Sequence, residues 1–504
     1  MVITGAFGPW CPDLPALNNP GVTIARNVTP GIGTQPGMVT YHPMRGLSLY
    51  SDTVLDSRPL GTLVGRDKSS LAKVYAGTKN SLFKLNANDL KWKNISADGG
   101  YSTADGERWV FAEFGDIVAA FNYSNEPQYI QKSQDIKYDR LTSLVRARHC
   151  AVVRDFLVVA NTLDALDGQV PYRVRWSAVN NPFDWNFSQQ TMADFQDIFN
   201  GGNIMGVVGG EAGYILMERS IVKMSFMGAP LIFQFDQLPS AMGKGCSVAE
   251  SIITVEGKTF FLSVDGFYVL EGDQIRPIGD GQINRYFLNN VDDARYQYMT
   301  VASDPAKKLV YWSYLSKGAS GEEADKILIY NYQTGNWSEA DATAGYIFNS
   351  LSLPWTIEQL DVFGTIEKVP APFDSPMWAG GDAMLWAMDK TGKIFIFGGT
   401  TMRGLIETQE QFLVSSISDA RGERTNVNRV RPLYHGTGLV QVRGGHRTNV
   451  YDALTYTESV PVNDKSGWAY FRYQNKFHRF RFSFEGEWSE AMGYHIEAFP
   501  AGDR

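Results

Sequence analysis

The sequence predicts an all-β fold: a β-propeller of six or seven blades, with an extended N-terminal arm and a C-terminal β-sandwich-like domain. Three observations predict this class. Aromatic residues make up 13% of the 504 residues and there are 49 glycines, a pairing that favours strands and tight turns. Short apolar runs alternate with turn residues through the middle of the chain. The last strands are longer and alternate apolar with polar side chains.

Residues 1–59 are expected to form the extended arm. Proline and glycine recur there too often for a helix or a long strand. The apolar side chains of the arm need a surface to cover them, either the body of the same chain or a neighbouring subunit. We take Trp10, Leu14 and Asn27 as candidate residues of an arm that clasps the next subunit.

Residues 60–420 are expected to form the propeller. Apolar hairpins recur there at spacings of roughly 35 to 75 residues, and a four-stranded blade takes about 40–50 residues, so six or seven blades with insertions fit. Radial stacking would bury both faces of each hairpin sheet. An ordinary β-sandwich is the alternative. The hairpins begin near residues 73, 109, 156, 214, 260, 310 and 385.

Two segments interrupt this pattern. Residues 282–287 and 292–298 predict one or two short helices between blades. Several prolines near residues 350–380 predict a long insertion between blades. Long insertions of this kind often carry binding functions.

Residues 421–504 are expected to form a small, separate antiparallel β domain. Phe480, Phe482 and Phe484 fall on one face of a strand, and Arg479 and Arg481 fall on the other. This region carries 12 Lys and Arg against 9 Asp and Glu, whereas the rest of the chain carries 34 against 45. The basic face is either a solvated sheet surface or a docking surface for an acidic partner. The candidate docking residues are Arg443, Arg447, Arg479 and Arg481.

The sequence gives no sign of catalysis, and we expect neither enzymatic activity, a cofactor nor a metal site. It contains no nucleophile elbow, zincin, Walker or kinase motif. The six histidines do not cluster at ligand spacings, and the three cysteines cannot form a disulfide framework. We expect no membrane-spanning segment, because no run of about 18 apolar residues occurs. The net charge of −8 argues against non-specific affinity for nucleic acid.

The order of several motifs resembles the tail nozzle, or DNA-stabilisation, proteins of short-tailed bacteriophages and related prophages. Each motif alone is weak, since aromatic and glycine turns occur in any propeller. The segments that carry the resemblance are Pro12-Asp13-Leu14, Asn19-Pro20-Gly21, Tyr41-His-Pro43, Tyr172-Arg-Val-Arg-Trp-Ser177, Asn181-Pro182-Phe-Asp-Trp185, Asp265-Gly-Phe-Tyr268, Ile329-Tyr-Asn-Tyr332, Gly335-Asn-Trp337 and Phe477 to Phe484.

This resemblance implies a virion protein at the distal end of the tail, made in the host cytoplasm. It implies a homo-hexameric ring below the portal adaptor (the head-to-tail connector), in contact with a tail fibre or tailspike. Double-stranded DNA would pass through the lumen without specific binding and be retained until ejection. An acidic body is compatible with such a conduit, because it repels phosphate.

Two other functions remain open from the sequence. The first is a β-propeller glycan-binding protein or glycoside hydrolase, for which the 12 tryptophans and 24 tyrosines could supply stacking surfaces. The second is a kelch-like interaction propeller, indicated only by the apolar run and diglycine of residues 394–399.

Overall fold

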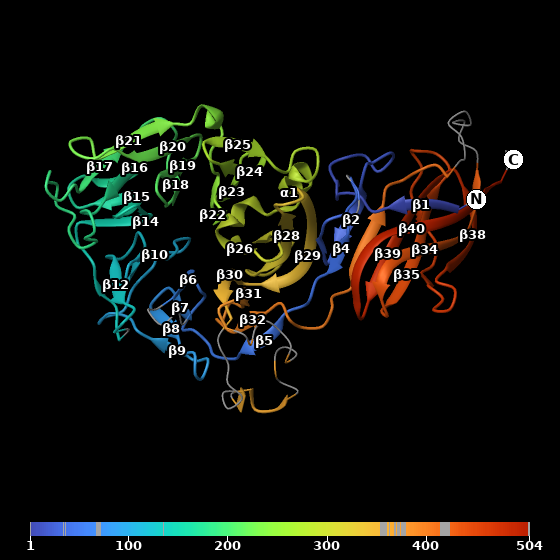
Figure 1. Cartoon of the computed structure of the whole chain (residues 1–504), viewed down its shortest axis with the longest axis horizontal. Coiled ribbons are helices and arrows are strands. Elements are labelled where there is room, and N and C mark those ends of the chain that lie inside the picture. The colour runs from blue at the N-terminus through green and yellow to red at the C-terminus, as the bar shows by residue number, and fades with distance from the viewer. Residues whose placement is uncertain are drawn as a thin grey trace.

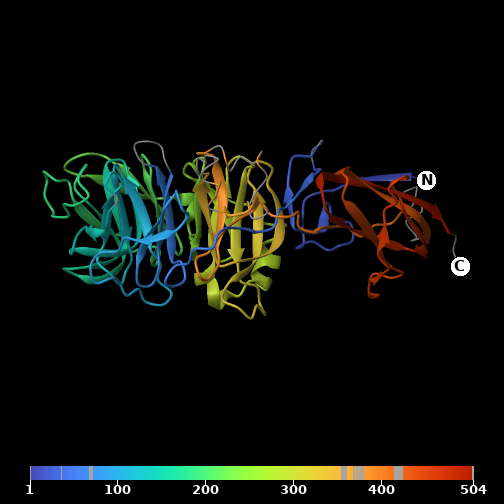
Figure 2. The same ribbon diagram turned by 90° about the horizontal axis from the view of Figure 1, so that it is seen from below.

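The computed structural model describes residues 2–33, 35, 37–66, 72–134, 136–352, 360–361, 363–366, 369, 373, 378, 380–413 and 424–501. The molecule is elongated, with a ring of sheets at one end and a smaller β body at the other (Figure 1), and Figure 2 shows the same two parts from below. The prediction of an all-β chain is confirmed. The helical elements in the described part are η1 (Pro239–Ala241), α1 (Asn284–Asn290) and η2 (Asp293–Tyr298), and the last two confirm the short helices expected there.

Seven sets of four antiparallel strands in the described residues form the ring, each ordered from the centre outwards. They are β6 (Gly61–Arg66), β7 (Ala72–Gly77), β8 (Leu82–Leu85) and β9 (Trp92–Asn94); β10 (Val110–Phe114), β11 (Ile117–Phe121), β12 (Gln128–Gln131) and β13 (Asp139–Arg140); β14 (Val145–Val153), β15 (Phe156–Asp164), β16 (Gly168–Trp176) and β17 (Asp194–Asp197); β18 (Ile204–Val208), β19 (Gly213–Met217), β20 (Ile221–Phe226) and β21 (Phe233–Gln237); β22 (Val248–Val255), β23 (Lys258–Ser263), β24 (Gly266–Glu271) and β25 (Gln274–Pro277); β26 (Thr300–Asp304), β27 (Leu309–Tyr314), β28 (Ala324–Asn331) and β29 (Asn336–Ala344); and β30 (Tyr346–Leu351), β31 (Ala383–Met388), β32 (Ile394–Ile396) and β5 (Ser48–Ser51).

The innermost strands contact one another in a closed circle, β6, β10, β14, β18, β22, β26, β30 and back to β6. This is the arrangement of a β-propeller. Apolar side chains fill the space between neighbouring sheets, so the second strand of a sheet is covered on both faces. All six residues of β27 are buried for this reason. A continuous apolar run is what such a doubly covered strand requires.

The last sheet of the ring takes its outermost strand from the N-terminal segment. Strand β5 pairs with β32, with Ile394 opposite Ser51 and Phe395 opposite Leu49. The ring of Tyr50 lies 4.8 Å from that of Trp386 in the same sheet. Since β5 precedes the first sheet and completes the seventh, it ties the two ends of the circle together without a covalent bond.

The second part, which we call the C-terminal body, contains two sheets in the described residues. One has the order β3-β4-β40-β34-β38 with β1 on β40, and the other runs β2-β33-β39-β35-β36 with β37 on β35. Phe482 of one sheet packs against Tyr494 of the other, with ring centroids 5.7 Å apart. The strands are β1 (Val2–Ala6), β2 (Val22–Arg26), β3 (Val28–Pro30), β4 (Tyr41–Pro43), β33 (Gly404–Thr408), β34 (Thr425–Gly436), β35 (Leu439–Arg447), β36 (Thr455–Tyr456), β37 (Val460–Pro461), β38 (Ala469–Asn475), β39 (Phe477–Glu485) and β40 (Trp488–Pro500).

The sheets cut across the boundaries 1–59, 60–420 and 421–504 drawn from the sequence. Of residues 1–59, strands β1–β4 belong to the C-terminal body and β5 belongs to the ring. Strand β33 precedes residue 420 but pairs with β39 of the C-terminal body. The insertion expected near residues 350–380 falls between β30 and β31, largely outside the described residues.

Candidate functional site

The ring and the C-terminal body share one backbone ladder. The outermost strand of the sixth sheet, β29, pairs in parallel with β2 at Glu339 and Arg26. Strand β2 then pairs with β33, so the hydrogen bonding runs unbroken from the centre of the ring into the C-terminal body. A shared sheet resists relative motion far better than a flexible linker does.

An ion pair with a buried carboxylate lies at this junction. Glu339 is 1% exposed, and its Oε1 lies 2.8 Å from Nη2 of Arg26. The hydroxyl of Tyr286, which lies on α1, donates to Oε2 of Glu339 at 2.7 Å. Burial, followed by the charge of Glu339, raises the pKa of Tyr286. The phenol therefore stays protonated and serves as a donor to the carboxylate.

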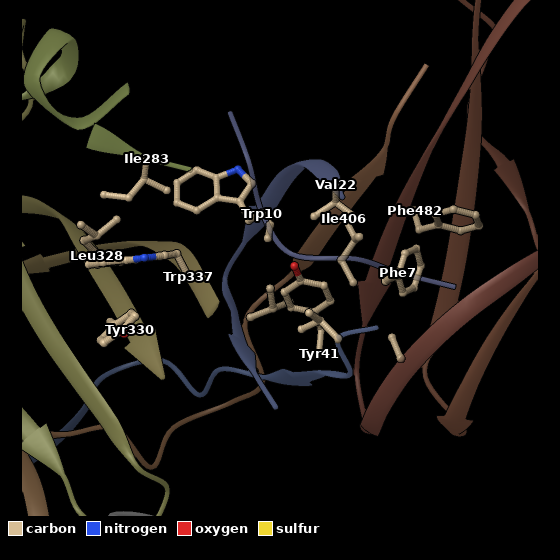
Figure 3. Packing of buried hydrophobic residues seen from close by; sticks show 14 of the residues in the cluster. Phe7, Trp10, Val22, Tyr41, Ile283, Leu328, Tyr330, Trp337, Ile406 and Phe482 are labelled. Atoms are coloured by element: carbon tan, nitrogen blue, oxygen red, sulfur yellow. The ribbon is translucent and has the colours of Figure 1, made fainter. Parts of the chain in front are cut away.

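Of the three arm residues chosen from the sequence, Trp10 and Asn27 contact this chain's own body, whereas the hydrogen bond of Leu14 stays within the arm. Trp10 is 1% exposed, and its ring meets that of Tyr286 edge-on at 5.1 Å. Figure 3 shows Trp10 between Ile283 and Trp337 on the ring side and Val22 on the other. Leu14 is half-buried, and its amide donates to the carbonyl of Cys11.

Asn27 bridges the two parts with its backbone and its side chain. Its amide donates to the carbonyl of Glu339 at 2.8 Å. Its Oδ1 accepts from the amide of Asp341 at 2.8 Å, and its Nδ2 donates to the carbonyl of Arg403 at 3.2 Å. Its φ of +57° lies in the left-handed region, which asparagine tolerates better than most residues. These three bonds hold the arm against its own chain.

The carboxylate of Asp13 also fastens the arm. It accepts from the amides of Arg285 at 2.9 Å and Tyr286 at 2.6 Å. These amides belong to the first turn of α1 and have no partner within the helix. Asp13 of the arm therefore acts as the N-terminal cap of α1, because the residue that precedes the helix makes no side-chain capping hydrogen bond.

The four candidate docking arginines are engaged within the chain. Nη2 of Arg447 contacts Glu410, which is fully buried, at 2.5 Å. Arg479 and Arg481 both contact the carboxylate of Glu407, at 2.8 Å and 2.5 Å. Nε of Arg443 donates to the carbonyl of Thr457. Glu407 of β33 and Glu410, two residues beyond the end of β33, supply carboxylates to Arg447, Arg479 and Arg481, whereas Arg443 contacts only a backbone carbonyl. Docking of an acidic partner on this face stays a prediction.

The ring encloses an axial cavity of about 490 Å3. All seven innermost strands contribute to its lining, so the cavity lies on the ring axis. A second cavity of about 430 Å3 adjoins it and shares Thr62, Ile252, Val301 and Tyr346. Together the two adjoining cavities form a concavity in the ring that could take a ligand.

Two ion pairs contribute to the lining of the axial cavity. Nε of Arg108 lies 3.6 Å from Oε1 of Glu250, and Nη2 of Arg148 lies 3.4 Å from Oε1 of Glu107. The guanidinium of Arg148 also stacks over the ring of Tyr123 at 4.3 Å. Each of the two carboxylates thus has its own arginine partner in the lining of the cavity.

Arg108 reaches across the ring. Its Nη2 donates to the carbonyls of Gln297 at 2.5 Å and Met299 at 2.8 Å, which lie in η2 and just after it. The segment before β10 is thereby tied to the segment before β26. Burial, followed by the charge of Arg108, lowers the pKa of nearby Arg58 to about 10.

A histidine completes the polar lining. Burial in the ring, followed by the charge of Arg148, lowers the pKa of His149 to about 4, so this imidazole is neutral at physiological pH. Among the described residues, no group of three or more His, Cys, Asp or Glu side chains is placed to hold a metal ion. None of the described helices has the length and apolarity needed to cross a membrane.

Comparisons with known proteins give only distant structural similarity. No family model and no curated protein matches the chain. A catalytically inactive variant of virginiamycin B lyase from Staphylococcus aureus with quinupristin superposes with a TM-score of 0.39 and 11% identity, over 69% of this chain and 97% of that chain. The Pan2 WD40 domain of Neurospora crassa gives 0.34 and 9%, over 59% and 90%. The extracellular domain of a hybrid two-component system protein from B. thetaiotaomicron gives 0.41 and 8%, over 87% and 60%. Similarity at this level supports no functional assignment.

The sequence reasoning missed the junction. Arg26, Tyr286 and Glu339 are separated by up to 313 positions, and none of them lies in a motif. Asn27 is the residue that could have pointed to the junction, because an asparagine between two strands is typical of a turn with positive φ.

Proposed function

We propose that this chain is a structural protein that works by assembly: the nozzle at the distal end of a short phage tail. Six copies would form a ring below the portal adaptor, contact a tail fibre or tailspike, and conduct and retain packaged DNA until ejection. The protein would be made in the host cytoplasm and function in the virion. It would need no cofactor and carry out no catalysis.

The rigid junction between the ring and the C-terminal body carries this proposal. A ring of subunits closes at one copy number only if each subunit presents its two contact surfaces at a fixed angle. The shared sheet of β29 and β2, with the ion pair of Arg26 and Glu339, fixes that angle within one chain. We interpret the seven four-stranded sets as seven blades and the C-terminal body as a β-sandwich-like domain.

The charge distribution supports the same role. The chain outside residues 421–504 carries 45 acidic against 34 basic residues, so a lumen lined by that part would repel the phosphates of passing DNA. The conduit would be the opening between subunits, because the axial cavity of a single ring measures only about 490 Å3 and Arg108 crosses the ring there.

Native mass measurement of the purified protein tests the proposal. A discrete hexamer, formed alone or on addition of the portal adaptor, is the expected result. A stable monomer at high concentration, unchanged by the adaptor, would overturn it.

A second function, glycan binding or hydrolysis at the axial cavity, is favoured by the lining of that cavity. Tyr123 and Tyr346 offer ring faces, and Glu107, Glu250, Arg108 and Arg148 offer hydrogen-bonding groups. Isothermal calorimetry with host oligosaccharides decides between the two functions. Binding that is lost in Tyr123→Ala would favour the glycan-binding role over the nozzle, and release of sugar would favour the hydrolase.

A further inference from the structure

The outer face of the sheet β1-β40-β34-β38 carries a basic surface that the sequence analysis did not single out. Along β34, Arg429 and Arg431 alternate with the buried Val430 and Pro432. On the edge strand β38, Arg472 lies between the buried Phe471 and the half-buried Tyr473. The three arginines therefore point away from the core of the C-terminal body.

The register of the strands brings these groups into neighbouring rows. Arg431 lies opposite His495 of β40, and Arg429 lies between Glu497 of β40 and Tyr470 of β38. Arg431 and Arg472 are exposed, and neither has an ion-pair partner in the described part of the chain. This differs from the arginines of the opposite sheet, which Glu407 and Glu410 neutralise.

Aromatic side chains lie among these arginines. Tyr470 is 55% exposed and Phe499 is 42% exposed. The guanidinium of Arg429 lies 4.5 Å from the ring centroid of Trp468, and Arg429 also contacts Glu497. Exposed tyrosine and arginine on a flat surface are the residue types enriched in protein interfaces.

We propose that this face, which we call the basic face, docks a protein surface rich in carboxylates. Its charged groups in the described residues of β34, β38 and β40 include Arg429, Arg431, Arg472, Glu490 and Glu497, which sum to +1 on a chain whose overall charge is −8. Guanidinium groups recognise carboxylates through paired hydrogen bonds. In Figure 1, strands β34, β38 and β40 lie at the end of the molecule away from the ring, where a partner can approach.

Nucleic acid fits this face less well than a protein does. Tight binding to a duplex takes about six to ten phosphate contacts, whereas the face offers three arginines and two carboxylates, Glu490 and Glu497. The carboxylate of Glu497 lies in the middle row and would repel a phosphate backbone. A protein can avoid that repulsion by placing its own acidic groups around Glu497.

The test measures binding of poly-L-glutamate to the full chain in 50 mM and 300 mM salt. The double variant Arg431→Gln/Arg472→Gln should weaken binding at least tenfold in low salt, because both removed charges are exposed and unpaired. Its matched control is Arg140→Gln/Arg276→Gln, which removes two exposed charges from the ring (side chains 62% and 55% exposed) and should leave binding unchanged. Glu497→Gln should tighten binding, because it removes the carboxylate that contacts Arg429 on this face.

Each other outcome overturns the proposal. Absence of binding, or equal loss in the test and control variants, would show that the face is not a docking site. Tighter binding of random-sequence duplex DNA than of poly-L-glutamate, lost in the same double variant, would assign the face to nucleic acid. A changed copy number of the double variant would assign it to contacts between copies. Equal melting temperatures of the variants and the unaltered chain would show that no difference reflects unfolding.

Discussion

Arg26 and Glu339 form a half-buried ion pair where the ring and the C-terminal body join, with Nη2 and Oε1 2.8 Å apart. The side chain of Glu339 is 2% exposed, and that of Arg26 is 35% exposed. The carboxylate of Glu339 is therefore removed from water. In the described structure, its side-chain hydrogen bonds come from Arg26 and Tyr286. Such a carboxylate is costly to leave without partners.

Glu339→Gln should lower the free energy of unfolding by about 2 kcal/mol. The carboxylate accepts hydrogen bonds from Arg26 at Oε1 and from Tyr286 at Oε2, whereas the glutamine amide has only one accepting oxygen. Urea unfolding followed by tryptophan fluorescence measures this. The control is Asp105→Asn, which breaks the exposed pair of Lys79 and Asp105 (51% and 95% exposed) and should cost less than about 0.5 kcal/mol. Equal stabilities of the two variants would contradict the role given to the junction.

Tyr50→Ala tests closure of the ring by β5. Tyr50 is 3% exposed and packs on Trp386, so truncation should cost about 3–5 kcal/mol, the range for large buried aromatic side chains. Leu49→Ala is the matched control, because Leu49 is next to it on the same strand and 46% exposed. Its effect should stay within about 0.5 kcal/mol. Thermal unfolding followed by circular dichroism gives both values, and a small effect of Tyr50→Ala would show that β5 does not hold the ring closed.

A buried histidine should make stability depend on pH. His478 is fully buried, and its Nε2 lies 2.6 Å from Oγ1 of Thr425. Burial lowers the pKa of His478 to about 4, below the value of about 6.5 in an unfolded chain. The unfolded state therefore binds more protons between these two values. Stability should be complete above about pH 6.5, fall as the pH drops towards 4, and level off below that.

The loss attributable to His478 should be on the order of 3 kcal/mol. Denaturant unfolding at several pH values, compared with His478→Gln, measures it. The variant should show a shallower slope between pH 4 and pH 6.5, even if its stability at pH 7 is lower. His149 should contribute a similar slope for the same reason. Identical slopes with and without His478 would contradict the assignment.

Arg108→Met should loosen one end of the axial cavity. The substitution removes the bonds to the carbonyls of Gln297 and Met299 and should speed hydrogen exchange of the amides in η2 by about tenfold, equivalent to about 1.4 kcal/mol. Arg148→Met is the control, because Arg148 lines the same cavity and contacts Glu107 and Tyr123 instead. Faster exchange of η2 in both variants would show that the contact across the ring is not specific to Arg108.

The sequence pattern correctly predicted those strands whose side-chain pattern depends only on which of their faces is buried. Phe480, Phe482 and Phe484 are all fully buried, as the alternation along that strand required. The repeated apolar hairpins correspond to sheets of the ring, because a strand covered on both faces must be apolar throughout.

Pairing between distant segments could not be predicted in this way. The alternation placed Arg479 and Arg481 on the other face, but only the fold shows that Glu407, more than 70 positions earlier, neutralises them. For the same reason, the sequence did not reveal the basic face with Arg429 and Arg431. The exposure of these side chains depends on which sheet β34 joins. The division of the arm between two bodies also follows from long-range pairing, in particular that of β5 with β32.

Electron microscopy of the purified full chain, alone and with the portal adaptor, tests the central claim most directly. The account predicts class averages of a six-fold ring with a central opening, in which each subunit shows the ring of sheets and the C-terminal body in one fixed orientation. Isolated elongated particles under both conditions, or particles whose two parts vary in angle, would contradict it.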